Sequence, residues 1–284
     1  MRRRVAVLLA LAATRASGEP APRWYVQVDN DVVAGTDRWY SSGVRLARVG
    51  PGGDEWGLFQ EVFTPEAKRS SPGVDDRAPA ARLLAYGARH SSDAGSLGTL
   101  EVALGVRGPS ALGRQATDVV HKLVPAPRVD WSRQEPDRLD AHLALARTQP
   151  LWGLLAHYGV VAGNQQVFVH GGLEARVAFG GARAAYSPAM RYAATPPPAA
   201  GESGWSAFVG GSVRAIARNA LIRRNYDASG PEIEPRRAVG RIVAGVAAVQ
   251  GWGSATLALV HEAREFDAQR QPQTFGSLTF HVEF

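Results

Sequence analysis

The sequence predicts an all-β protein, a transmembrane antiparallel up-and-down β-barrel of about 12 strands. Three observations predict it. Apolar and polar residues alternate along many short segments, the N-terminus has the pattern of a secretion signal, and no apolar stretch reaches the roughly 20 residues of a membrane-spanning helix. Strands with one wholly apolar face fit a barrel wall that has lipid outside and water inside.

The first residues predict export from the cytoplasm. Arg2-Arg3-Arg4 is a basic segment, Val5 to Ala13 is apolar, and Ala16-Ser17-Gly18 offers small residues at which a signal peptidase could cut. We therefore expect residues 1–18 to be a signal peptide and residues 19–284 to form a single barrel domain. The sequence contains no internal repeat that would suggest a second domain.

The overall charge says little about partners. The formal net charge is +6 and the pI is near 10.0, but Arg2, Arg3, Arg4 and Arg15 lie in the expected signal peptide, and +2 remains without them. We therefore expect no nucleic-acid partner. The chain has no cysteine, although disulfides persist outside the cytoplasm, so its stability must come from another source such as a closed hydrogen-bonded barrel.

The last residues show the alternation best. Leu278, Phe280, Val282 and Phe284 face one way, and the residues between them are polar. The same pattern returns in residues 172–179, where Glu174 and Arg176 alternate with apolar side chains. Charged residues at alternate positions fit a wet lumen. A terminal aromatic residue on such a strand is typical of bacterial outer-membrane barrels.

The pattern predicts twelve strands, an even number as in single-chain bacterial barrels. They cover residues 23–30, 40–49, 55–64, 80–90, 97–107, 138–148, 150–162, 168–180, 204–217, 238–250, 252–265 and 274–284. Short links such as Gln149-Pro150 and Gly251-Trp252 alternate with long connections. Short periplasmic turns and longer outer loops would give this alternation.

The long connections are Gly108 to Asp137, Ser187 to Ser203 and Asn225 to Arg237. Within the first, Gln115 to Leu123 could form a turn or two of helix. Within the second, the prolines at 196–198 predict an extended, exposed loop. Six tryptophans near predicted strand ends fit aromatic girdles at the membrane surfaces: Trp24, Trp39, Trp56, Trp152, Trp205 and Trp252.

Polar residues cluster in the connection between the first two predicted strands. Asn30-Asp31 ends the first strand and Tyr40-Ser41-Ser42-Gly43 begins the second. On composition alone this is a polar hairpin loop as readily as a functional site. His121, in the long connection after residue 107, is on its own more readily a solvated surface histidine than a catalytic base.

The ordered set of such pieces resembles the outer-membrane lipid A 3′-O-deacylase family, the LpxR-type barrels. The resemblance covers essentially the whole chain after the signal. The matching pieces are Asn30-Asp31, Thr36-Asp37, Tyr40-Ser41-Ser42-Gly43, Phe63-Thr64-Pro65, Asp75-Asp76-Arg77, Gly105-Val106-Arg107-Gly108-Pro109, Gly113, His121, Trp131, Gln134, Glu265-Phe266, Gln269 and Phe275-Gly276-Ser277.

The resemblance implies a twelve-stranded barrel in the bacterial outer membrane that uses Ca²⁺ and hydrolyses the 3′ acyloxyacyl ester of lipid A, the membrane anchor of lipopolysaccharide. It implies that His121 activates the attacking water and that Asn30, Asp31 and Ser41 complete the site. Asn30 and Asp31 would lie near the metal, and their oxygens are the hard ligands that Ca²⁺ prefers. Lys68 or Arg69 would hold a lipid A phosphate.

This sequence departs from the family pattern at several positions. Ser41 stands where threonine is common, which keeps the hydroxyl. Thr117 replaces a usual glutamine, and Pro125-Ala126-Pro127 lacks an acidic residue that some members carry. Residues 78–81 also differ from the usual run. These changes leave the core set intact and bear on specificity and on whether this member is active.

Two other functions fit a barrel of this size. The first is an outer-membrane phospholipase A, which would have a nucleophilic serine two residues after a histidine. In this sequence only His90-Ser91-Ser92 has that spacing, and the residues on either side do not match the phospholipase motif. The G-x-S-x-G motif of α/β-hydrolases is absent. The other is a catalytically silent barrel, either a passive channel or a structural member that kept the fold. A channel would need an open polar bore, for which twelve strands leave little room.

Overall fold

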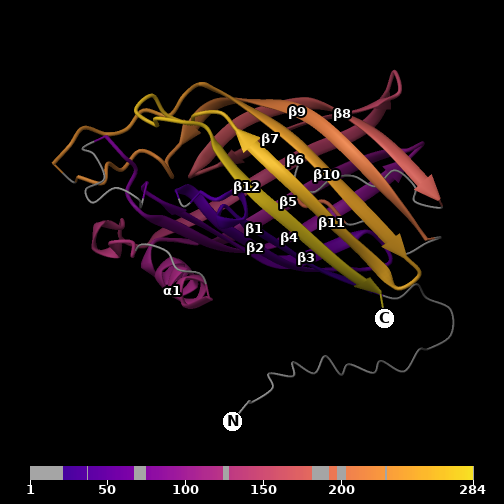
Figure 1. Cartoon of the computed structure of the whole chain (residues 1–284), viewed down its shortest axis with the longest axis horizontal. Coiled ribbons are helices and arrows are strands. Elements are labelled where there is room, and N and C mark those ends of the chain that lie inside the picture. The colour runs from indigo at the N-terminus through magenta and orange to yellow at the C-terminus, as the bar shows by residue number, and fades with distance from the viewer. Residues whose placement is uncertain are drawn as a thin grey trace, which may run out of the picture.

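The computed structural model describes residues 22–36, 38–66, 75–123, 128–180, 192–196, 203–227 and 229–283. Twelve strands pair antiparallel, each with its neighbours in sequence, and β1 pairs with β12 to close the barrel (Figure 1). The predicted fold class and strand number are therefore confirmed. The expected signal peptide lies outside the described residues.

The strand bounds follow the predicted ones closely. They are β1 Arg23–Asn30, β2 Trp39–Val49, β3 Asp54–Thr64, β4 Ala80–Asp93, β5 Ser96–Arg107, β6 Arg138–Leu151, β7 Leu154–Gly163, β8 Gln166–Gly180, β9 Gly204–Asn219, β10 Ala238–Gln250, β11 Gly253–Glu262 and β12 Gln273–Glu283. The link expected at Gln149-Pro150 is wrong, because both residues pair within β6 and the turn is at Trp152-Gly153, where Trp152 has φ 51° and Gly153 has φ 79°.

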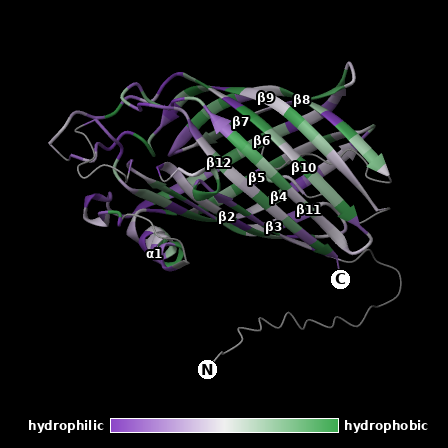
Figure 2. Ribbon diagram, in the orientation of Figure 1, coloured by the Kyte–Doolittle hydropathy of each residue, from purple (hydrophilic) through white to green (hydrophobic). Residues whose placement is uncertain are grey.

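The alternation along each strand separates an apolar outer face from a polar inner face. On β12, Leu278 and Phe280 are exposed, whereas Ser277, Thr279 and His281 are buried. Exposed apolar side chains recur around the wall, and the strands are largely apolar along their middle (Figure 2). An outer face of this kind is suited to contact with lipid acyl chains.

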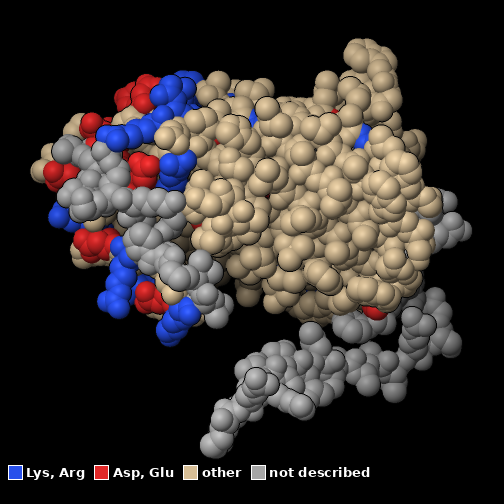
Figure 3. Space-filling view, in the orientation of Figure 1, with Lys and Arg blue, Asp and Glu red and all other residues tan. Residues whose placement is uncertain are grey.

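The two ends of the barrel differ. The first strand begins and the last strand ends at the same end of the barrel, where tight turns join most hairpins. Apart from the connection between β8 and β9, the long connections lie at the other end (Figure 1). Short turns are typical of the periplasmic end, so the long loops mark the outer end. The charged side chains in view also gather at the outer end (Figure 3). Among the described residues, no helix has the length and apolar character to cross a bilayer.

Five of the six tryptophans form an aromatic girdle at the periplasmic end, as predicted. These are Trp24, Trp56, Trp152, Trp205 and Trp252. The expectation for Trp39 is wrong. This side chain is at the outer end and only 1% exposed, because it packs with Ile222, Ile233 and Phe266 beneath the outer loops.

Residues 192–196, from the connection between β8 and β9, lie inside the barrel. Ala193, Ala194 and Thr195 are buried, and the Ala194 amide donates to Glu101 Oε2 at 2.6 Å. The exposed loop was expected at the prolines 196–198. Of these, Pro196 is half-buried, and Pro197 and Pro198 lie outside the described residues. The amide finds its acceptor on β5, so this periplasmic connection helps to fill the lumen.

Candidate active site

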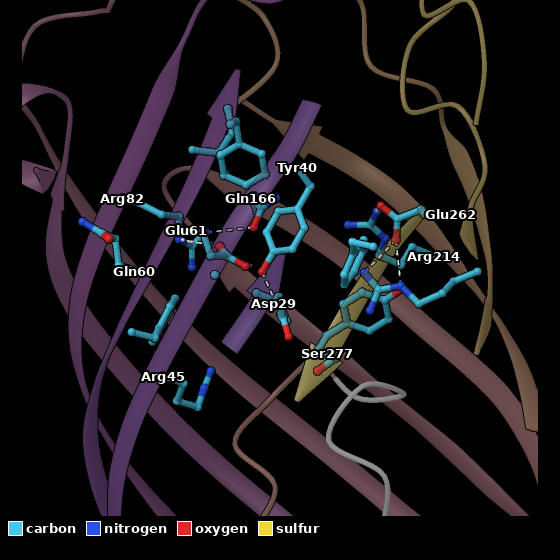
Figure 4. Close-up of a pocket in the computed structure, with 18 of the residues that line it drawn as sticks. Asp29, Tyr40, Arg45, Gln60, Glu61, Arg82, Gln166, Arg214, Glu262 and Ser277 are labelled. Carbon is cyan, nitrogen blue, oxygen red and sulfur yellow. Dashed lines mark hydrogen bonds and ion pairs between the residues drawn. The ribbon is translucent and has the colours of Figure 1, made fainter. Parts of the chain in front are cut away.

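The lumen contains a cavity of 160 Å³ at mid-barrel, lined by aromatic rings and ion pairs (Figure 4). Arg214 donates to Glu262 Oε1 at 2.9 Å, and Arg241 donates to the other oxygen of the same carboxylate at 2.7 Å. On the opposite side, Arg82 lies 3.2 Å from Glu61. Because these buried charges are offset by partners, the lumen resembles a polar core. Asn30, Asp31, Ser41 and His121 do not line this cavity.

Asn30, Asp31 and Ser41 come together where β1 ends and β2 begins. Asn30 pairs with Ser42 in the ladder, and the Asp31 amide donates to the Ser41 carbonyl at 3.3 Å. The Asn30 side-chain oxygen accepts from the Val32 amide at 2.9 Å, which turns the chain into a short 3-10 helix, Val32–Ala34. The hairpin therefore holds three of the four candidate residues in adjoining positions.

The Asp31 carboxylate is fixed in place and only 2% exposed. It accepts from the Arg38 amide at 2.7 Å, and the Asp31 carbonyl accepts from the amides of Ala34 and Thr36. Arg38 in turn forms an ion pair with Glu66 at 3.1 Å. Asp31 thus ties the loop after β1 to the chain that follows β3.

The side chains of this hairpin that could meet a substrate are on the outside of the barrel. On β1, Tyr25 points inward, Val26 and Val28 are exposed, and the alternation places Asn30 on their side. A bulge shifts the register between Tyr40 and Ser42. Ser41 Oγ lies 2.5 Å from Oγ1 of Thr64, which alternation along β3 also places on the outer face. The candidate site is therefore on the wall that faces lipid.

A row of paired residues connects this hairpin to the helix that carries His121. Asn30 pairs with Ser42, Ser42 with Val62, and Val62 with Ala81, across four neighbouring strands. At about 4.8 Å per strand the row covers about 14 Å. The helix α1, Gly113–Leu123, begins against the last residue of the row and packs on β3 and β4 outside the barrel (Figure 1).

Close approach at the start of α1 requires glycine. A Cβ at Gly113 would lie 2.4 Å from the Ala81 Cβ and 2.7 Å from Cη2 of Trp131. Just before the helix, the Ala111 carbonyl accepts from Gln60 Nε2 at 2.6 Å. These contacts press the N-terminal end of α1 onto the wall.

His121 is on the face of α1 that turns to the barrel. Gly113 and Thr117 are buried and His121 is half-buried, whereas Asp118 and Lys122 are exposed. Positions four residues apart share a helix face, so Gly113, Thr117 and His121 form one stripe. Among the described residues, His121 forms no hydrogen bond with Asn30, Asp31 or Ser41. The predicted helix is confirmed, and its buried face includes the histidine.

Asp137 anchors the segment that leads into α1. Its carboxylate accepts from the Ser110 amide at 2.8 Å and from the Ser110 hydroxyl at 2.6 Å. These two hydrogen bonds hold the pKa of Asp137 below its usual value. Gly108 has φ 121°, and a Cβ there would lie 2.7 Å from Asp137 Oδ1. The carboxylate therefore fixes the turn from which the helix starts.

Lys68 and Arg69 lie outside the described residues. The chain just before them is near the hairpin, because Glu66 binds Arg38 and the Glu66 amide donates to Asp76 at 2.8 Å. Burial raises the pKa of the Asp76 carboxyl, although the hydrogen bonds that it accepts from the backbone amides of Glu66 and Arg77 act to lower it.

The donor set of the hairpin suits a hard cation in its chemistry. Asn30 and Asp31 supply an amide and a carboxylate oxygen, and backbone carbonyls are close by, which are the ligand types of Ca²⁺. Among the described residues, no three His, Cys, Asp or Glu side chains gather into a cluster that could hold a metal. A Ca²⁺ ion at this hairpin would therefore need backbone carbonyls and water as further ligands, in addition to the side chains of Asn30 and Asp31.

The histidine and serine that a phospholipase would need are not arranged as a catalytic pair. His90 Nε2 lies 2.8 Å from Glu55 and Nδ1 lies 2.9 Å from Thr99 Oγ1, inside the barrel near its periplasmic end. Both ring nitrogens therefore have partners other than Ser92. This geometry argues against the phospholipase alternative.

The closed barrel with its apolar outer wall, periplasmic girdle and charged outer loops defines an integral outer-membrane β-barrel protein. A model of the family described as "Outer membrane protein LpxR" matches residues 4–284. The chain therefore belongs to the LpxR family, the outer-membrane lipid A deacylases.

The solved structure of LpxR from Salmonella typhimurium has the same fold. It superimposes with a TM-score of 0.72 at 16% sequence identity, covering 92% of this chain and 100% of that chain. Among curated proteins, none matches this chain by sequence.

Two contacts at the candidate site were not predicted from the sequence. Thr64 was noted as part of a motif, but its bond to Ser41 depends on the bulge in β2. The contact between Ser110 and Asp137 joins residues far apart in sequence and carries no local signal. An aspartate directly before a strand is an ordinary loop residue until its partner is known.

Proposed function

We propose that this protein hydrolyses the ester that joins the 3′ acyloxyacyl chain to lipid A in the outer leaflet. The observation that supports this most is the common placement of Asn30, Ser41 and the His121 helix on the outer wall at the outer end of the barrel. A lipid whose headgroup lies at that level could present its ester to these side chains while its acyl chains stay in the bilayer.

In the proposed reaction, His121 acts as general base. Its neutral imidazole takes a proton from water, the water oxygen attacks the ester carbonyl carbon, and the bond to the 3′ oxygen breaks. The leaving 3′ oxygen takes this proton from the imidazolium and becomes the sugar hydroxyl, and the released fatty acid loses its remaining proton to solvent and leaves as a carboxylate. The Ser41 hydroxyl and the Asn30 amide group are the nearby donors that could stabilise the oxyanion.

We also propose that Ca²⁺ binds at Asn30 and Asp31. When bound, it would supply a positive charge that stabilises the developing oxyanion. Asp31 is held by Arg38, so its carboxylate would meet the ion already oriented. Addition of Ca²⁺ should raise the thermal unfolding temperature of the wild type and leave that of Asp31→Asn unchanged, a result that does not depend on activity.

Lys68 and Arg69 are proposed to hold a lipid A phosphate. They follow Glu66, which is tied through Arg38 to the candidate hairpin. A double substitution to glutamine should raise KM for lipid A more than it lowers kcat, because binding of a remote phosphate contributes equally before and during the reaction.

The decisive experiment is mass spectrometry of lipid A incubated with the purified, folded protein and Ca²⁺. The wild type should remove the 3′ acyloxyacyl chain, and His121→Ala should not. Lys122→Ala is the matched control, because it changes the neighbouring exposed residue of the same helix. Identical lipid A with and without wild-type protein would overturn the proposal.

A further inference from the structure

A hollow of 630 Å³ lies on the outer wall over β4 to β7, outside the lumen and away from the candidate active site. Leu100, Leu145 and Val160 pair across β5, β6 and β7 and give the hollow an apolar floor. In the next row, Gly98 stands between Ser91 and Arg147. Because Gly98 has no side chain, the wall is depressed at this point.

The hollow is at the level of the periplasmic membrane surface. Along β6, the outward residues Leu139, Leu143 and Leu145 are exposed apolar side chains, and the next outward residue is Arg147. With a rise of 3.4 Å per residue and a tilt near 40°, the distance from Leu139 to Arg147 is about 20 Å along the barrel axis. This is close to the height of the apolar band of such barrels, so Arg147 marks its periplasmic edge.

Arg147 is a cation without an acidic partner among the described residues. Its Nε donates to Gln149 Oε1 at 3.1 Å, and Tyr158 pairs beside it on β7. Arg89, which also lines the hollow, forms an ion pair with Asp54, but both side chains are more than 60% exposed, so the pair neutralises little. Among the residues that line the hollow, Arg147 is therefore a cation with no carboxylate partner.

We propose that this hollow binds an anionic phospholipid of the periplasmic leaflet. One acyl chain lies over Gly98 against Leu100 and Leu145, and the lipid phosphate accepts hydrogen bonds from the Arg147 guanidinium. Guanidinium groups bind phosphate through paired, charge-assisted hydrogen bonds. The net negative charge of the headgroup complements the surplus cation, which favours phosphatidylglycerol over a zwitterionic lipid.

The test is native mass spectrometry of the full chain, released from detergent micelles after titration with dioleoyl phosphatidylglycerol or dioleoyl phosphatidylcholine. The wild type should bind phosphatidylglycerol about tenfold more tightly than phosphatidylcholine. Arg147→Gln should remove that preference. Gly98→Leu should weaken binding of both lipids, because the side chain fills the seat of the acyl chain.

Arg48→Gln is the matched control. Arg48 is also an outward arginine near the periplasmic end, paired with Trp24 and Trp56, but it does not line the hollow. Its variant should bind as the wild type does. The proposal is overturned if Arg147→Gln keeps the wild-type preference, if Arg48→Gln loses it equally, or if the two lipids bind the wild type with equal affinity. A shift in gel mobility on heating verifies that each variant is folded.

Discussion

Ser41 Oγ and Thr64 Oγ1 lie 2.5 Å apart on the outer face of neighbouring strands. Thr64 is 1% exposed, so it can hold the Ser41 hydroxyl in one direction without competition from water. Under the proposed mechanism Thr64 is a positioning residue. It acts on the substrate only through Ser41.

Thr64→Val keeps the shape of the side chain and removes its hydroxyl. We expect kcat for lipid A deacylation to fall about fivefold to tenfold with little change in KM, since one neutral hydrogen bond is lost. Thr64→Ser should restore most of the rate. Equal rates for the valine and serine variants would show that the hydroxyl has no such role.

Gly113→Ala should displace α1 from the wall without changing the stability of the barrel. The added methyl group would meet Ala81 and Trp131, so the helix must move away from the wall. Because small displacements of catalytic groups are costly, we expect about a hundredfold loss of activity with an intact barrel. Gly251→Ala is the control, because nothing lies within 4 Å of a Cβ there. Wild-type activity of Gly113→Ala would contradict the proposal that catalysis depends on how α1 holds His121 against the wall.

The attachment of α1 should weaken in acid. Ser110 lowers the pKa of Asp137 in the folded protein, so the ionised carboxylate stabilises the native turn. This contribution is present above the usual pKa of aspartate and is lost as the pH falls through the lowered value. Hydrogen exchange at the Ser110 amide should therefore accelerate, relative to the intrinsic rate, at low pH. In Asp137→Asn the protection should be independent of pH.

The lumen charges should matter far more for stability than the surface charges. Glu262→Gln leaves Arg214 and Arg241 without their shared carboxylate, and we expect a loss of about 3 kcal/mol in the free energy of unfolding. Asp267→Asn breaks an ion pair with Arg236 in which Asp267 is 89% exposed, and about 0–1 kcal/mol is expected. Urea unfolding in micelles, followed by tryptophan fluorescence, measures both. Equal losses of unfolding free energy in the two variants would contradict the larger contribution of the lumen ion pairs.

The purified protein should show no ion conductance in planar bilayers. Residues 192–196 and the ion pairs occupy the lumen, and the cavity that lies between them has a volume of 160 Å³. A continuous aqueous path is therefore not expected. Regular conductance steps would contradict this and would revive the channel alternative.

The alternation of side chains was sufficient to predict the strands, because lipid outside and a polar lumen inside impose a period of two on every strand. The turn between β6 and β7 was misplaced because Pro150 looked like a turn residue, although it pairs inside a strand. Trp39 was assigned to a girdle from its place at a strand end. Its burial depends on Ile222 and Phe266, which are distant in sequence.

The candidate site was predictable only in part. Asn30, Asp31 and Ser41 belong to one hairpin, so their proximity follows from local sequence. The lumen pairs of Arg214 and Glu262 depend on the register of strands that do not share a hairpin, and no local pattern encodes it. The roles of His121, Lys68, Arg69 and Ca²⁺ remain proposals.

The outward direction of Asn30 and Thr64 has a kinetic consequence. A substrate that reaches an exterior wall arrives by lateral diffusion within its own leaflet, so its encounter rate depends on molecules per unit area of membrane. Turnover should then respond to dilution of lipid A with other lipids at constant bulk concentration. It should also respond to how densely the surrounding lipids are packed.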